Sequence, residues 1–331
     1  MKSTIIPVLL AGAASALPTV NITASTCVAP SKRIEWRQLG AANQQSYLNA
    51  VKCLKTKPSR LGIEPASTLY DDFPYVHFQL NNYIHGGAPF LPWHRYFTHV
   101  YFDALAECGY VGPGTYWDWT LDTDGLRFSP VMAAENGFGG DGSDTRTEPN
   151  ADPKDKRPFR CVSDGPLANI RPYYVAITPK EMKAGGHCLF RKLPEVSEPE
   201  AFKKMMEGSI IEPALSNVQA SGNWSTYAWA LEGGPHGVIH ASLGGEMNPT
   251  TSPNEPLFFL HHAQIDHLWW LWQQEDTSKR LTEYNGPAFH FNEEGSREVS
   301  LDDVLPMYGL VERELTVREV IDTYGELCYS Y

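Results

Sequence analysis

The sequence predicts a mainly α-helical protein whose core is a four-helix bundle that carries a binuclear metal site, with long loops and disulfides around it. Apolar residues recur at helical spacing on several segments. Nine of the eleven histidines fall in two short windows, 77–99 and 236–267. Neutral imidazole suits copper, zinc, iron and nickel, and bundles build metal sites from inward-facing side chains. Two helices are therefore expected to hold each of two metal ions.

Helical periodicity and breaking residues place five helices along the chain. Pro92 fits the first turn of a helix, because its missing N–H would have no partner there. The Asn81-Asn82 and Gly86-Gly87 steps place His85 in a loop after the second helix. The five expected helices cover residues 33–56, 71–80, 93–107, 200–206 and 254–274.

The middle of the chain has no helical periodicity. The segment Gly112–Thr123 is rich in aromatic residues and is expected to lie buried beside the core. From Asp124 to Pro199 glycine, proline, aspartate and asparagine dominate. This composition predicts long loops, pinned by Cys161 and Cys188.

The first residues have the pattern of a secretory signal peptide. Lys2 precedes an apolar run from Ile5 to Ala14, and a small-residue cleavage site follows at Ala16. We therefore expect residues 1–16 to be a signal peptide and the protein to be secreted. No later segment has the ~20 apolar residues of a membrane helix. A formal net charge of −12 argues against nucleic acid or an anionic membrane surface as a partner.

The cysteine content is consistent with secretion. All six cysteines follow the signal peptide, and an even number in a secreted chain predicts three disulfides, with fifteen possible connectivities. No CxxC spacing indicates a thiolate metal site. Asn21 and Asn223 begin glycosylation sequons.

The spacing of the later histidines distinguishes candidate ligands. His236 and His240 are four residues apart and lie on one face of a helix. Neighbours such as His261 and His262 diverge by about 100° on a helix, so both cannot point at one metal. Asp266 follows His262 by one turn, where its carboxylate can accept the other ring N–H and set the tautomer. This supporting role of Asp266 favours His262 as the ligand. The histidines interpreted as structural are His99, His187 and His290.

Several motifs closely resemble the tyrosinase, catechol oxidase and haemocyanin superfamily: PFLPWHRYF (89–97), TYWDW (115–119) and SPNEPLFFLHHAQIDHLWWLWQ (252–273). The resemblance covers nearly the whole chain, from residue 35 to the terminal Tyr-Ser-Tyr. It implies a single catalytic domain over 17–331, without a C-terminal lid domain. It also implies two sets of metal ligands, one matching His77, His85 and His94 and the other matching His236, His240 and His262.

The resemblance implies a type-3 dicopper oxidase that uses O2 to convert o-diphenols or o-aminophenols to quinones in fungal pigment or secondary metabolism. Glu232 matches a family glutamate that holds a water and helps to deprotonate the aromatic substrate. Gly237 and Ala241, which follow His236 and His240, are candidates for the substrate pocket. Members that hydroxylate monophenols often carry asparagine at the position of Gly237, so glycine favours diphenol oxidation.

Two further departures leave an alternative open. Tyr83 stands where many fungal members have a cysteine that forms a thioether with the second histidine. Phe102 replaces a glutamate that is usual in the copper enzymes and should alter ligand orientation. The superfamily also contains zinc-dependent cyclopenases of quinolone alkaloid biosynthesis. The alternative is therefore a non-redox lyase or rearrangement enzyme, with zinc as Lewis acid and Glu232 as acid and base.

We expect each disulfide to fasten a different part of the molecule. One ties the two chain ends, one joins two helices, and one pins the long loop region. Packing of Arg33 or Arg37 near Tyr329 and Tyr331 would also bring the chain ends together. The expected pairs are Cys27–Cys328, Cys53–Cys108 and Cys161–Cys188.

Overall fold

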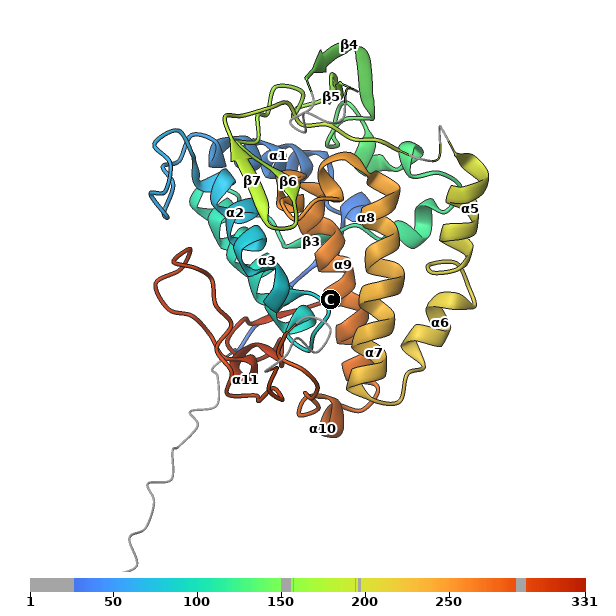
Figure 1. Cartoon of the computed structure of the whole chain (residues 1–331). Helices are drawn as coiled ribbons and strands as arrows, with labels where there is room; N and C mark the ends of the chain where they lie inside the picture. Colours follow the sequence, from blue (N-terminus) through green and yellow to red (C-terminus); the bar gives the residue numbers. More distant parts are fainter. Residues whose placement is uncertain (1–26, 150–155, 157, 194, 196–197, 290–295) are drawn as a thin grey trace, which may run out of the picture.

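The computed structural model describes residues 27–149, 156, 158–193, 195, 198–289 and 296–331. Helix α3 packs against α2 and α9, and α9 contacts the short π-helical segment η5 that joins α7 to α8 (Figure 1). The predicted mainly helical bundle is therefore confirmed. The central helices are α2 (Leu69–Ile84), α3 (Phe90–Glu107), α7 (Trp224–Leu231), η5 (Glu232–His236), α8 (Gly237–Leu243) and α9 (Leu257–Gln274).

Local sequence explains where α2 begins, and packing explains where it ends. The side chains of Thr68 and Asp71 form a capping box at its start. The helix continues through Asn81 and Asn82, so the break expected there was wrong. Ile84 in the last turn is fully buried, and this packing outweighs the weak helix propensity of asparagine. His85 then follows in extended backbone conformation, outside the helix as expected.

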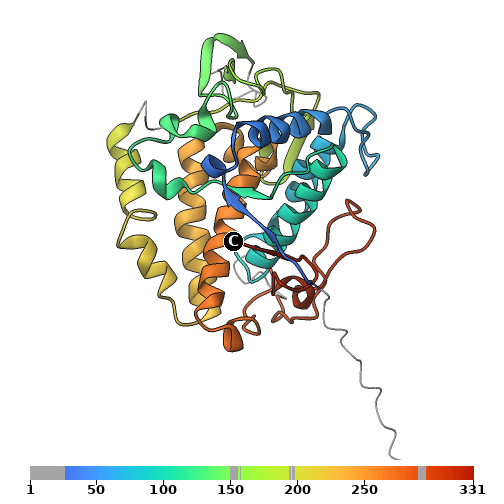
Figure 2. The ribbon, with the colours of Figure 1, turned by 180° about the vertical axis from the view of Figure 1, so that it is seen from behind.

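The N-terminal segment is only partly helical, so the single helix expected over 33–56 was wrong. Strand β1 (Ser31–Lys32) pairs in parallel with β8 (Tyr329–Ser330), and β2 (Ile34–Glu35) pairs in parallel with β3 (Thr115–Tyr116). These partners are distant in sequence, which is why local periodicity did not reveal them. A 3-10 turn η1 (Trp36–Gln38) and helix α1 (Ala41–Leu54) follow. Figure 2 shows the N-terminal strand running beside the chain's C-terminus.

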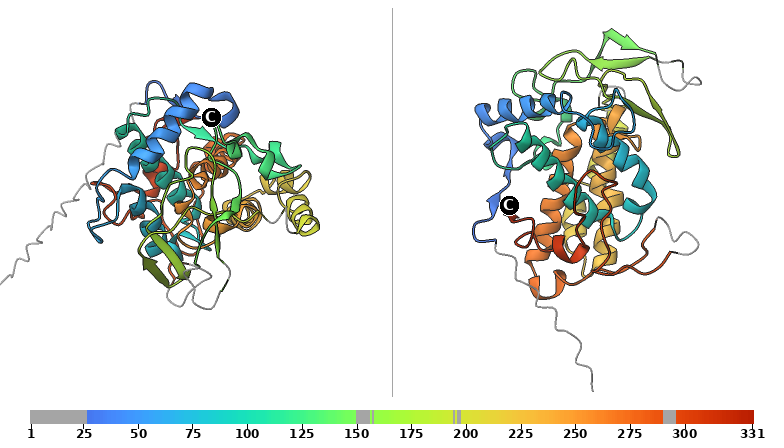
Figure 3. Two further views of the ribbon diagram at one scale, coloured as in Figure 1. Left: turned by 90° about the horizontal axis from the view of Figure 1, so that it is seen from above. Right: turned by 90° about the vertical axis from the view of Figure 1, so that its left-hand side faces the viewer.

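The region expected to be loops contains two antiparallel hairpins. Strand β4 (Gly142–Glu148) pairs with β5 (Phe159–Val162), and β6 (Tyr174–Thr178) pairs with β7 (Glu181–Ala184). Both hairpins lie at one end of the bundle (Figure 3). Backbone pairing and the Cys161–Cys188 disulfide order this region despite its turn-rich composition. The remaining elements are η2 (Trp119–Asp122), η3 (Leu126–Phe128), η4 (Pro130–Met132), α5 (Pro199–Glu207), α6 (Ala214–Gln219), η6 (Gly245–Met247), η7 (Ser252–Asn254), α10 (Thr277–Arg280) and α11 (Val317–Val320).

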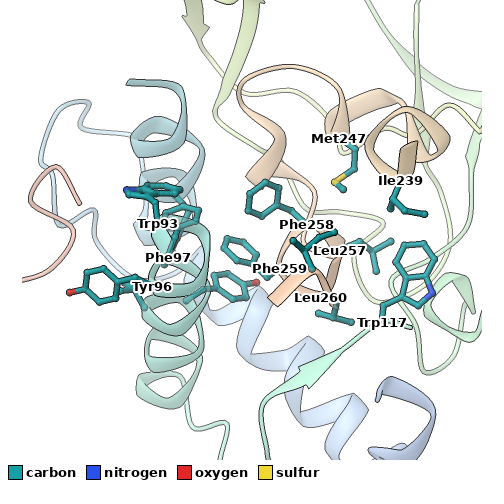
Figure 4. Packing of buried hydrophobic residues seen from close by; sticks show 14 of the residues in the cluster. Trp93, Tyr96, Phe97, Trp117, Ile239, Met247, Leu257, Phe258, Phe259 and Leu260 are labelled. Carbon is teal, nitrogen blue, oxygen red and sulfur yellow. The ribbon is translucent and has the colours of Figure 1, made fainter. Parts of the chain in front are cut away.

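Aromatic side chains fill the space between α3 and α9 (Figure 4). Tyr101 and Phe259 stack with ring centroids 3.4 Å apart, and Trp93 stacks on Phe97 at 4.4 Å. In the aromatic-rich segment Gly112–Thr123, Trp117 and Trp119 are fully buried as expected, whereas Leu121 is exposed. Close packing of large rigid rings limits movement of the helices that carry the histidines.

All three expected disulfides are present and link the expected parts of the molecule. The pair Cys27–Cys328 joins the chain ends, Cys53–Cys108 joins the ends of α1 and α3, and Cys161–Cys188 joins strand β5 to the segment after β7. The expected signal peptide and the sequon at Asn21 lie outside the described residues, as does His290. Among the helices that the structure describes, none combines the length and the hydropathy needed to cross a membrane.

Candidate metal centre

Two groups of histidines converge between the central helices. The first contains His77 on α2, His85 directly after α2, and His94 on α3. The second contains His236, His240, His261 and His262, from the η5–α8 segment and α9. Within each group, one candidate ligand atom per residue lies within 4.8 Å of all the others. The groups face each other, because the rings of His94 and His262 stack with centroids 4.3 Å apart.

Backbone carbonyls orient five of these rings in the same way. Nδ1 of His77, His94 and His240 lies 2.7, 2.8 and 2.6 Å from the carbonyl oxygens of Thr250, Phe90 and Met247, respectively. His85 and His236 approach the carbonyls of Asn81 and Glu232 at 3.3 and 3.0 Å. A carbonyl only accepts, so Nδ1 carries the proton and Nε2 keeps a lone pair in each neutral ring.

The Nε2 atoms are spaced as metal ligands would be. The Nε2 atoms of His77 and His94 lie 3.4 Å apart, and those of His240 and His262 lie 3.4 Å apart. The lone pairs of His77 and His94 cannot hydrogen bond to each other. In a tetrahedral site with bonds of about 2.0–2.1 Å, ligand nitrogens lie about 3.3 Å apart. The side chains of both groups therefore fit a bound metal ion.

Burial keeps these imidazoles neutral in the metal-free protein. Burial, followed by the neighbouring imidazoles, holds the pKa of His94 and His262 well below the ordinary value. Burial also lowers the pKa of His240 to about 4. Only neutral imidazole can bind a metal, so the electrostatics agree with the geometry.

The segment from Gly245 to Asn254 orients one histidine in each group, through the carbonyls of Met247 and Thr250. Glu246 anchors this segment: it is fully buried, pairs with His187 and accepts a 3.0 Å hydrogen bond from Asn254. Sequence reasoning missed these residues, because a backbone carbonyl has no residue-type signal.

The adjacent pair His261 and His262 differ in their partners. Nδ1 of His261 accepts a 3.2 Å hydrogen bond from the indole N–H of Trp119. Nδ1 of His262 has no hydrogen-bond partner among the described residues. Both rings are buried, and one ring nitrogen of each lies within 4.8 Å of the other and of the rest of the group. The expectation that divergence on the helix keeps the two residues from facing one metal was therefore wrong.

The supporting role expected for Asp266 was wrong. Its carboxylate does not hydrogen bond to His262, because stronger partners surround it. Arg95 donates to one carboxylate oxygen at 2.5 Å, and Arg33 donates to the other at 3.0 Å. Tyr329 and Tyr331 also donate to Asp266. The residue therefore binds the chain ends and α3 to α9.

A family model for the common central domain of tyrosinase matches residues 67–275, which include every histidine of the two groups. The chain belongs to the tyrosinase family. The tyrosinase-like protein phomQ1 of Diaporthe leptostromiformis is 38% identical over 313 residues, covering 92% of this chain and 78% of the relative. N-acetyl-6-hydroxytryptophan oxidase ivoB of Emericella nidulans is 33% identical over 362 residues, which cover 97% of this chain and 98% of that relative. A solved structure of a mutant polyphenol oxidase from Thermothelomyces thermophila has a TM-score of 0.76 at 28% identity, covering 91% of this chain and 88% of that one.

Membership of the tyrosinase family indicates that the two histidine groups form a metal site. The tyrosinase fold implies a binuclear metal site, and the described residues supply two facing histidine groups where that site belongs. The resemblance stated from the sequence motifs is confirmed.

In this tyrosinase-family chain, Glu232 lies beside the turn that carries His85. The backbone N–H of Gly86 donates to its carboxylate at 2.7 Å. Burial raises the pKa of Glu232 to about 7. A cavity of about 30 Å³ adjoins it, between Trp224, Trp229 and Pro287. That volume holds a water molecule.

The remaining residues that the sequence analysis singled out are two small residues on α8 and two aromatic residues. Gly237 and Ala241 are half-buried on α8, next to His236 and His240, and neither lines the cavity at Glu232. The side chain of Tyr83 lies against Phe289. Phe102 packs against Tyr47 and beneath the guanidinium of Arg33.

Proposed function

We propose that this chain is a dicopper oxidase that converts o-diphenols or o-aminophenols to quinones with O2. The observation that carries the proposal is the convergence of Nε2 atoms in two facing groups, with pairs of nitrogens 3.4 Å apart. Imidazole-only sites of this kind suit copper. The proposed ligands are His77, His85 and His94 for one ion, and His236, His240 and His262 for the other.

The chain's own residues would bind and deprotonate the substrate. When bound, two copper ions supply the electron transfer between O2 and the aromatic ring. Glu232, with a pKa of about 7, is proposed to orient a water near the histidines and take the proton from a substrate hydroxyl. Gly237 and Ala241 are proposed to border the substrate beside the histidines. Two diphenols and one O2 then balance as two quinones and two waters.

The names of the relatives support an oxidative reaction on a hydroxylated aromatic ring. One is called an oxidase of N-acetyl-6-hydroxytryptophan, and the structural neighbour is called a polyphenol oxidase. The organisms of the relatives support a fungal setting, and we propose a role in pigment or secondary metabolism.

Three disulfides are typical of proteins in oxidising compartments. We therefore propose that the protein is secreted by way of the signal peptide at 1–16.

The second candidate is a zinc-dependent, non-redox reaction of the cyclopenase type. Two observations favour it: six imidazoles also accept zinc, and Phe102, packed on Tyr47, occupies the place of a glutamate usual in the copper enzymes.

Turnover with and without oxygen separates the two candidates. The protein is expected to oxidise a catechol in air, to stop when oxygen is removed, and to contain two copper ions when isolated from its native host. Conversion of a cyclopenin-type substrate at full rate without oxygen, with no catechol oxidation, would reverse the choice in favour of zinc.

A further inference from the structure

Trp119, the last residue of the TYWDW motif, contacts the second histidine group directly. Its indole N–H donates to Nδ1 of His261 at 3.2 Å, and both side chains are fully buried. An indole N–H can only donate, so Nδ1 of His261 must hold the lone pair. The proton of the neutral ring therefore sits on Nε2, opposite to the five rings whose Nδ1 atoms face backbone carbonyls.

The motif is fastened to α9 on both sides of His261. The backbone N–H of Trp117 donates to the carbonyl of Leu260 at 3.1 Å, and the two residues lie side by side in Figure 4. The side chain of Gln264 donates to Asp118 at 3.1 Å. These contacts hold Trp119 in register with His261.

We propose that Trp119 is a positioning residue that prevents His261 from binding the metal, an inference that rests on the ligand set in the proposed function. The second group contains four imidazoles, enough for a closed tetrahedral site. Structural metal sites are closed in this way, whereas catalytic sites keep one position open for substrate. Because the Nε2 of His261 carries a proton, it offers no lone pair, and the metal keeps three histidines and an open position.

The matched variants are Trp119→Phe and Trp117→Phe. Each removes one buried indole N–H from the same motif, since Trp117 donates to Asp122 at 2.8 Å rather than to a histidine. In Trp119→Phe, His261 can move its proton to Nδ1 and bind metal. We expect both variants to bind two metal ions. Catechol oxidation should fall by about 10–100-fold in Trp119→Phe only, the usual range for lost support of a metal ligand. The double variant Trp119→Phe, His261→Gln should regain catechol oxidation, because it lacks the imidazole that would bind the metal.

Nitrogen-15 NMR of histidine-labelled, zinc-loaded protein tests the tautomer without any turnover. The His261 signal, identified by its loss in His261→Gln, should show the proton on Nε2 in the wild type and a metal-bound nitrogen in Trp119→Phe. A proton on Nδ1 of His261 in the wild type, or equal activity of the two tryptophan variants, would overturn the proposal. Absence of catechol oxidation in every protein, with the expected tautomer, would count against the proposed function and leave the role of Trp119 supported.

Discussion

The position of one proton on each imidazole determines which histidines of the centre can hold a metal. Carbonyls of Phe90, Met247 and Thr250 fix that proton on Nδ1, while the indole of Trp119 fixes it on Nε2. Burial then keeps the rings neutral by lowering their pKa values. Residue identity supplies the ligands, and in the proposed ligands other than His262 a hydrogen bond on the far side of the ring leaves Nε2 free to bind a metal.

Replacing Glu232 by glutamine should separate proton transfer from metal binding. Glu232→Gln keeps the size of the side chain and can still accept from Gly86, but it removes a base whose pKa is about 7. We expect the rate to fall by about 10²–10⁴-fold with metal content unchanged. The wild-type rate should rise with pH as this carboxyl ionises, and the variant should lose that rise. Rate profiles and metal analysis measure both effects, and an unchanged profile would contradict the role.

Alanine at His240 or His262 should abolish activity and remove at least one metal ion. The Nε2 atoms of these residues lie 3.4 Å apart, so loss of either leaves two ligands in the second group. His99→Ala is the control, because His99 belongs to neither histidine group and pairs with Asp103 on the same helix. His187 is a poor control, because its removal would leave Glu246 buried without its partner. Full activity in His262→Ala would transfer the ligand role to His261.

Each helix of the bundle contributes to the site in a different way. Helices α2, α3 and α9 present histidines from regular turns, whereas the π-helical segment η5 lies between Glu232 and His236 and includes Pro235. Single π-helical turns often occur at functional sites, because the extra residue re-aims the following side chains. The segment from Gly245 to Asn254 then links the two groups, since it supplies a carbonyl to each.

Asparagine in place of Gly237 should broaden the reaction to monophenols. The backbone of Gly237 is helical, and an added Cβ would meet only the carbonyl oxygen of Glu232 at 3.5 Å, an ordinary contact. Gly237→Asn should therefore fold normally. We expect it to increase the ratio of monophenol hydroxylation to catechol oxidation, measured with a matched pair of substrates. Gly237→Ala is the control for the lost glycine, and an unchanged ratio in Gly237→Asn would contradict the role of this position.

The two ends of the chain close the molecule around Asp266. This carboxylate binds Arg33 between β1 and β2, Arg95 on α3, Tyr329 on β8 and Tyr331 directly after β8. Burial raises the pKa of Asp266, but the charges of Arg95 and Arg33 and the hydrogen bonds from the two tyrosines together lower it below its ordinary value. Because Arg95 follows His94 and Asp266 lies one turn after His262, this ion pair also joins the helices of the two metal groups.

Removing the carboxylate of Asp266 should destabilise the whole fold. Asp266→Ala leaves Arg33 and Arg95 buried without a counter-charge, which typically costs about 3–5 kcal/mol. Denaturant unfolding should show this loss. Asp302→Ala, which removes only an exposed pair with Arg318, should unfold like the wild type. Equal stability of the two variants would show that Asp266 is not the centre of this network.

Acid should destabilise the metal-free protein through its buried histidines. Burial lowers the pKa of His77 and His236 well below the ordinary value, so the folded state stays neutral where the unfolded chain binds protons. Stability should therefore fall as the pH drops from about 7.5 to about 5.5, through the unfolded value of about 6.5. Urea midpoints at the two pH values measure the effect. His262→Gln should show a smaller fall, and pH-independent midpoints in the wild type would contradict the interpretation.

Spacing along the chain was sufficient to predict the helical bundle and the two histidine groups, because helical periodicity and clustering of one residue type are local properties. The disulfide pairs, predicted from the parts of the chain that each would join, are also present in the structure. Only the tertiary structure showed that Asp266 forms ion pairs with two arginines and that Trp119 donates a hydrogen bond to His261. It also decided that Ser31–Lys32 and Ile34–Glu35 are strands. These features depend on backbone carbonyls and on partners far away in sequence, and neither leaves a periodic pattern in the chain.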